Sequence, residues 1–151
     1  MKTYQKIILT ILLAAVASYL FGCMNYPVYT AADTLHENRP TVASLNLAYR
    51  DANRDFFYGG LPESKTKVAL LDLTPQGWMG NTTQFTDGTW QIDIDIKSHP
   101  LEKEAEMTLI HEMCHQDSRI SGADQGLDGH SGAFEACMVH VAERGGFKGL
   151  W

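Results

Sequence analysis

The five residues HEMCH at positions 111–115 constrain this chain more than any other feature of its sequence. On an α-helix, side chains four residues apart lie on one face, so His111 and His115 can point at the same spot. Two neutral imidazoles at this spacing can hold one Zn²⁺. Glu112 would lie beside the metal, where it can take a proton from a water molecule that the metal activates. The motif therefore predicts a helix that carries the core of a zinc hydrolase.

A catalytic zinc site needs a third protein ligand, and several residues after the motif can provide it. One class of zinc proteases places a glycine and a histidine at fixed positions downstream. Here those positions hold Ser118 and Ser121, which excludes that class. The remaining candidates are His130, Glu135 and His140. We interpret His140 as a surface or packed residue, because it lies far from His130 along a predicted last helix.

The N-terminus is typical of a secretory signal. Lys2 and Lys6 precede residues 7–21, an almost purely apolar run that is shorter than the roughly twenty residues of a membrane span. The Leu-Phe-Gly-Cys ending at residues 20–23 resembles a bacterial lipobox, although its phenylalanine is larger than that pattern prefers. Simple cleavage and an uncleaved signal anchor therefore stay open. We predict an exported lipoprotein of the cell envelope, anchored to the membrane through lipid on Cys23.

Charge and length limit the partners and the number of domains. Removal of a signal peptide of residues 1–22 takes away two lysines, which brings the formal net charge from −6 to −8. Nucleic-acid-binding domains are usually basic, so we expect no nucleic acid as a partner. Residues 23–41 suit a tether, and residues 42–151 are long enough for one domain with a core of its own.

The spacing of apolar residues predicts an α+β fold with a small antiparallel sheet. Residues 41–56 carry apolar side chains at helical spacing. Strands are expected at residues 67–73, 78–85 and 90–96, and the Asp-Gly pair before the last strand is a hairpin signal.

Polar residues in and around these elements indicate solvated faces, helix ends and caps. In the last strand, Asp93 and Asp95 alternate with isoleucines, and we interpret them as a solvated face rather than as a pair of catalytic acids. The HEMCH helix is expected to begin after His99-Pro100 and to end near Ser118. Ser131 is expected to cap a C-terminal helix.

Two cysteines remain if Cys23 carries lipid. Cys114 and Cys137 would then lie in a compartment that permits disulfides, but the sequence does not show whether their Cα atoms are within reach. We interpret them as two small buried apolar residues. Cys114 lies within one helical turn of His111, so spacing alone does not exclude it as a zinc ligand.

Taken together, these motifs resemble the SprT/Spartan-like zinc metalloproteases. Besides HEMCH, the match consists of a Gly-His step at residues 129–130 followed by Phe134, and an Asn-x-x-Phe-Phe segment at residues 53–57 that leads to Leu61-Pro62. The order of hairpin, alternating strand and acidic helix start is similar as well. The resemblance covers about residues 43–145.

The resemblance implies a minimal zincin-like domain with an N-terminal helix, a small sheet, the HEMCH helix and a C-terminal helix. It implies that His111, His115 and His130 bind Zn²⁺ and that Glu112 is the general base, with Glu135 as the alternative third ligand. The acidic charge and the export signal depart from family members that act on DNA-bound proteins.

We therefore expect a zinc metalloendopeptidase of the cell envelope that acts on proteins or peptides. A non-catalytic zinc-binding envelope lipoprotein that binds a partner protein is the alternative. A DNA-linked protease agrees less well with the charge and the signal.

Overall fold

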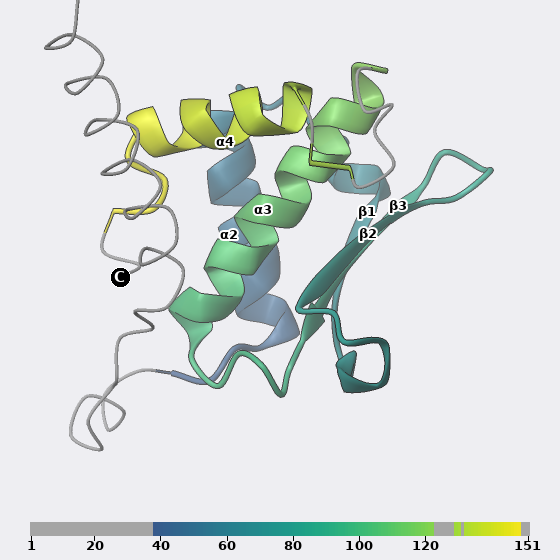
Figure 1. The fold of residues 1–151 in the computed structure, drawn as a ribbon, viewed down its shortest axis with the longest axis vertical. Helices are drawn as coiled ribbons and strands as arrows, with labels where there is room; N and C mark the ends of the chain where they lie inside the picture. Colours follow the sequence, from purple (N-terminus) through teal and green to yellow (C-terminus); the bar gives the residue numbers. More distant parts are fainter. Residues whose placement is uncertain (1–37, 123–128, 131, 149–151) are drawn as a thin grey trace, which may run out of the picture. The chain divides into compact units, whose positions relative to one another are not determined.

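The computed structural model describes residues 38–122, 129–130 and 132–148, all of which belong to one compact unit, Thr34–Trp151. Three α-helices and a three-stranded sheet make up this part of the chain, which confirms the predicted α+β class (Figure 1). The elements in chain order are α2 (Val42–Phe56), β1 (Thr66–Leu71), β2 (Gly80–Gln84), β3 (Trp90–Asp95), α3 (Glu102–Ile120) and α4 (Ala133–Glu143). Short 3-10 helices precede and follow β1, at Glu63–Lys65 and Thr74–Gln76.

Several predictions concern residues outside this part. The predicted signal peptide, Cys23, most of the tether and the proposed cap Ser131 all lie outside the described residues. None of the described helices is both long enough and apolar enough to cross a membrane.

Helix α2 begins where the sequence predicts. The hydroxyl of Thr41 accepts a hydrogen bond from the backbone N–H of Ser44, and the hydroxyl of Ser44 accepts one from the backbone N–H of Thr41. This reciprocal pair is a capping box, which satisfies two N–H groups at the helix start. The helix ends at Phe56 because Tyr58 and Gly59 take left-handed backbone angles, with φ of 54° and 72°.

The sheet is mixed, with the strand order β1-β3-β2. β2 and β3 form the predicted antiparallel hairpin, in which Thr82 lies opposite Ile92. β1 runs parallel to β3, so the prediction of an antiparallel sheet is wrong for this pair. The segment between β1 and β2 carries the chain past the position that β3 then fills. As a result, β3 is the central strand, and β1 and β2 are the two edge strands of the sheet.

The polar face of β3 is buried, contrary to the predicted solvated face. Asp93 and Asp95 are only 8% and 0% exposed. The carboxylate of Asp95 accepts hydrogen bonds from the backbone N–H of Leu73 and from the backbone N–H and hydroxyl of Ser98. Asp95 therefore links, through its carboxylate, the segment that follows β1 to the segment that follows β3. The alternation within one strand could not show that these segments fold over it.

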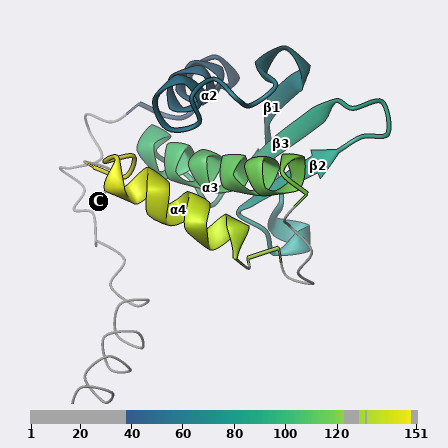
Figure 2. The same ribbon diagram turned by 90° about the horizontal axis from the view of Figure 1, so that it is seen from above.

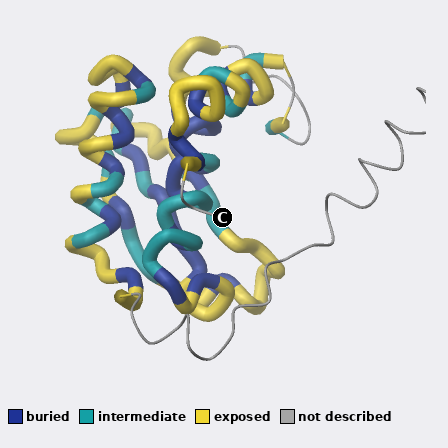
Figure 3. Tube along the Cα trace, turned by 90° about the vertical axis from the view of Figure 1, so that its left-hand side faces the viewer, coloured by how far each residue is buried: buried dark blue, intermediate teal, exposed yellow. Residues whose placement is uncertain are grey.

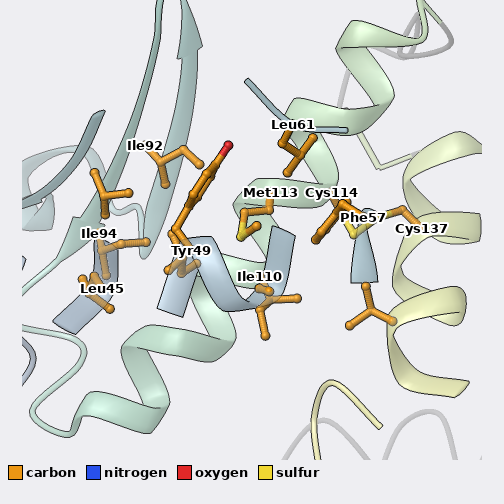
Figure 4. Close-up of a cluster of buried hydrophobic side chains, with 14 of the residues drawn as sticks. Leu45, Tyr49, Phe57, Leu61, Ile92, Ile94, Ile110, Met113, Cys114 and Cys137 are labelled. Atoms are coloured by element: carbon orange, nitrogen blue, oxygen red, sulfur yellow. A yellow bond between two sulfur atoms is a disulfide. The ribbon is translucent and has the colours of Figure 1, made fainter. Parts of the chain in front are cut away.

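Helix α3 lies at the centre of the unit. In Figure 2 it runs between α2 and α4, and it also packs against β2 and β3. The buried residues of these elements form one hydrophobic core (Figures 3 and 4). Its fully buried apolar members include Leu45, Ile92, Ile94, Leu109, Met113 and Val141. Burial of each such side chain stabilises the fold by about 1.5–3 kcal/mol, so α3 is fixed firmly in place.

A disulfide joins α3 to α4. Cys114 and Cys137 are linked with an S–S distance of 1.99 Å, so their interpretation as two small buried apolar residues is wrong (Figure 4). Their Cα atoms are 5.6 Å apart, inside the range of about 4.4–6.8 Å that a disulfide can bridge. This proximity results from the packing of two helices, which no local sequence pattern reports.

Candidate metal centre

The HEMCH motif lies within α3, as predicted, and the helix places its two histidines one turn apart on the same face. The Nε2 atoms of His111 and His115 are 3.2 Å apart. His115 is buried and His111 is half-buried. The core fixes the backbone of α3, and the helix therefore places the Cα atoms of this pair one turn apart.

His130 brings a third imidazole to the pair. Its Nε2 lies 3.2 Å from Nε2 of His111, and the ligand atoms of the three histidines all lie within 4.8 Å of one another. The ring of Phe134, in the first turn of α4, contacts all three imidazoles, with centroid distances of 4.8 Å to His111, 4.3 Å to His115 and 4.8 Å to His130. α3 and the start of α4 therefore assemble the predicted three-histidine group around one aromatic side chain.

The spacing of the three imidazoles is suitable for zinc. In a tetrahedral site with Zn–N distances of about 2.0–2.1 Å, two ligating nitrogens lie about 3.3 Å apart. The Nε2 of His111 lies 3.2 Å from that of His115 and 3.2 Å from that of His130. Three protein ligands leave one coordination position open, which is typical of catalytic rather than structural zinc sites. The three histidines could therefore hold a metal ion and leave one coordination position open.

The protonation state of His111 is compatible with metal binding. Burial, followed by the neighbouring charges of His115 and His130, lowers the pKa of His111 to about 4. The imidazole is therefore neutral at pH 7, which is the form that coordinates a metal ion. Metal binding near neutral pH does not have to displace a proton from this ring.

Glu112 lies buried next to the first histidine and is only 5% exposed. Burial raises its pKa to about 7; the hydrogen bond from Thr82 and the charge of Arg119 act in the opposite direction, while the charge of Asp93 raises the pKa further. A carboxyl group with a pKa near neutrality can both accept and return a proton at physiological pH.

Strand β2 packs directly against Glu112. The hydroxyl oxygen of Thr82 lies 2.8 Å from Oε2 of Glu112 and 2.9 Å from its backbone carbonyl oxygen. A Cβ atom at Gly80 would lie 2.7 Å from Oε1 of Glu112 and 2.7 Å from Cγ2 of Thr108, so any larger residue here would displace one of these side chains. The guanidinium of Arg119 donates a hydrogen bond to the backbone carbonyl of Thr82. The carboxylate is thus enclosed between α3 and β2.

The three histidines and Glu112 line one open cleft with a volume of about 860 Å³. This volume is near the upper end of the roughly 300–1,000 Å³ that is typical of ligand-binding sites. Trp78 and Met79, just before β2, form an apolar part of the wall and are 52% and 48% exposed. Met138 and Phe147 provide apolar lining from α4 and the segment after it. The cleft therefore combines a polar centre with apolar walls.

The other candidate ligands lie elsewhere. Glu135 is exposed on α4 and does not belong to the group of metal-ligating side chains found among the described residues. His140 packs with its Nε2 3.1 Å from the backbone carbonyl oxygen of Phe56, in agreement with its interpretation as a packed residue. Cys114 is occupied in the disulfide. The structure therefore favours His130 as the third ligand.

Sequence reasoning did not identify Gly80, Thr82 or Arg119 as parts of the site. Thr82 and Glu112 are 30 residues apart, so no local pattern connects them. Arg119 follows His115 by four residues, and this helical spacing was the one signal that could have indicated it.

The sequence matches no protein-family model and no curated protein. The relationship to the SprT/Spartan-like proteases therefore stays a prediction.

Proposed function

We propose that this protein is a zinc-dependent metalloendopeptidase. The observation that carries the proposal is the convergence of His111, His115 and His130 in one open cleft, beside the buried carboxyl group of Glu112. Zinc held by the three imidazoles would supply a Lewis acid that polarises a peptide carbonyl and makes a water molecule more acidic.

In this proposal Glu112 is the general base. Its carboxylate accepts a proton from the attacking water as the new C–O bond forms. It then passes that proton to the amine nitrogen as the C–N bond breaks. Burial raises the pKa of Glu112 to about 7 in the metal-free protein, and a bound cation would favour the ionised form that accepts the proton. The three histidines hold the metal, and the lowered pKa of His111 keeps that ring ready to bind it.

The shape of the cleft supports a protein or peptide as the substrate. The cleft is open and has a volume of about 860 Å³, so a short extended segment of a protein can enter it. Trp78 and Met79 would contact apolar side chains of that segment. The formal charge of −6 argues against nucleic acid as a partner.

Hydrolysis of an unfolded protein by the zinc-loaded chain tests the enzymatic proposal. We expect Glu112→Gln to lower the rate by about 10²- to 10⁴-fold while zinc binding is retained, because only the proton acceptor is removed. Glu135→Gln is the matched control, since it changes an exposed glutamate outside the three-histidine group. A chelator should abolish hydrolysis, and added zinc should restore it.

The alternative, a non-catalytic zinc-binding lipoprotein, predicts a different outcome. Wild-type protein and Glu112→Gln would both bind zinc, and neither would hydrolyse any protein offered. That result would contradict the proposed activity.

We also propose that the protein is exported and held at the membrane by lipid on Cys23. The apolar N-terminal run and its Leu-Phe-Gly-Cys ending are the basis of this proposal. The disulfide gives weak support, because disulfides persist mainly in oxidising compartments. Mass spectrometry of the mature N-terminus should find an acylated Cys23. An unmodified Cys23, or a mature chain without it, would contradict the lipid anchor.

A further inference from the structure

The hydroxyl group of Thr82 makes both of its contacts to a single residue. Its oxygen lies 2.8 Å from the carboxylate of Glu112 and 2.9 Å from the backbone carbonyl oxygen of the same residue. Thr82 is itself only 4% exposed, so water does not compete freely for these contacts. Because Thr82 contacts both the backbone and the carboxylate of Glu112, it restricts the side-chain torsion angles of that glutamate.

Gly80 brings the backbone of β2 close to the other side of the same carboxylate. A Cβ atom there would lie 2.7 Å from Oε1 and 2.9 Å from Cγ of Glu112. Contacts this short require a shift of the glutamate, so the absence of a side chain is what allows the carboxylate to lie against the strand. The orientation of the Glu112 carboxylate is thus restricted by Thr82 at Oε2 and by the strand at Gly80 at Oε1.

Arg119 fixes the strand that makes these contacts. Its guanidinium donates a hydrogen bond to the backbone carbonyl of Thr82, and β2 is one of the two edge strands of the sheet. Arg119 lies one helical turn after His115, so it projects from the metal-ligating face of α3. The helix that carries two of the ligands therefore also holds the strand that orients Glu112.

We propose that Thr82 is a positioning residue for the general base, and that it holds the Glu112 carboxylate in the orientation for proton transfer. The inference rests on the proposed peptidase function. Thr82 acts through Glu112 rather than on the substrate. Orientation matters for this group because a misplacement of about 1 Å in a reacting group can cost about 100-fold in rate.

Two threonines of β2 allow a matched test. Thr82→Val removes the hydroxyl at nearly constant volume, and Thr82→Ser retains it. Thr83→Val makes the same change one residue further along, where the hydroxyl lies 3.0 Å from Nδ2 of Asn81. We expect Thr82→Val to lower kcat by about 10- to 100-fold with KM and zinc stoichiometry unchanged, as for other supporting groups around metal sites. Thr82→Ser and Thr83→Val should behave like the wild type.

Wild-type kcat in Thr82→Val, or an equal loss in Thr83→Val, would overturn the proposal. Thr82→Ala also removes the hydroxyl and is measured alongside, so that a folding defect in one variant leaves the test intact.

Crystal structures of the zinc-loaded variants provide a measurement that does not depend on hydrolysis. The Glu112 carboxylate should leave its wild-type position in Thr82→Val and keep it in Thr83→Val. If the carboxylate stays in place without the Thr82 hydroxyl, the positioning role is wrong even when the wild type is an active peptidase. If the carboxylate moves but the wild type hydrolyses nothing, the contact is confirmed and the proposed function is the part that fails.

Discussion

The two helix-borne histidines and the third histidine are positioned in different ways. His111 and His115 lie one turn apart on α3, and the core fixes that helix. His130 is exposed and precedes α4, so its place depends on the ring of Phe134 and on the packing of α4 against α3. The comparison shows that one half of the site depends on helix geometry and the other half on tertiary contacts.

Removal of a histidine from either half of the site should lower zinc affinity more than any other substitution. We expect His111→Ala and His130→Ala each to lower zinc affinity by more than 100-fold, beyond the 10- to 100-fold cost that is typical of supporting residues. Glu135→Ala should retain wild-type affinity, because its side chain lies outside the three-histidine group. Calorimetric titration with zinc measures all three. Tight zinc binding by His130→Ala would show that the two helix-borne histidines do not need the third.

Loss of the disulfide should affect the two halves unequally. The cysteines are 23 residues apart, and replacement of both by alanine should lower the free energy of unfolding by about 3 kcal/mol. Urea denaturation measures this loss. Because the bridge ties α4 to α3, we also expect zinc affinity to fall about tenfold as the His130 side of the site loses pre-organisation. If zinc affinity stays unchanged, other contacts are sufficient to hold His130.

The last prediction concerns the pH dependence of stability and tests the burial of Glu112 in the helix-borne half. In the metal-free protein the pKa of Glu112 is raised from 4.5 to about 7. The folded state therefore holds this proton more tightly than the unfolded state, and the stability that Glu112 contributes at low pH is lost as the pH rises from 4.5 through 7. Glutamine does not titrate. The stability of Glu112→Gln relative to the wild type should therefore increase over this window and then level off.

Urea denaturation at a series of pH values, with a chelator present, measures this difference. Zinc should reduce the trend, because a nearby cation favours the ionised carboxylate. His111 is present in both proteins, so its own titration largely cancels. A stability difference that does not vary with pH would show that Glu112 is not buried as a neutral group.

The features that the sequence predicted are those with a local signal. Helix α2 is defined by periodicity and capping within a few residues of the chain, and the α3 motif by the four-residue spacing of its histidines. The hairpin between β2 and β3 has its Asp-Gly turn in the sequence. His130 was predicted through a Gly-His step and a family resemblance, and the structure brings it to the other two histidines.

The features that were missed depend on contacts between distant segments. The parallel pairing of β1 with β3 and the burial of Asp95 both depend on how the connecting segments cross the sheet. The disulfide depends on the approach of α4 to α3, and Thr82 reaches Glu112 across 30 residues. None of these has a spacing rule that a single sequence can reveal.

X-ray absorption at the zinc edge of the zinc-loaded protein tests the three-histidine site most directly. We expect three imidazole nitrogens at about 2.0–2.1 Å and at least one further oxygen, as in a catalytic site with an open position. His130→Ala should lose one imidazole from this shell wherever zinc is still bound. A sulfur ligand, four imidazoles, or only two in the wild type would contradict the site.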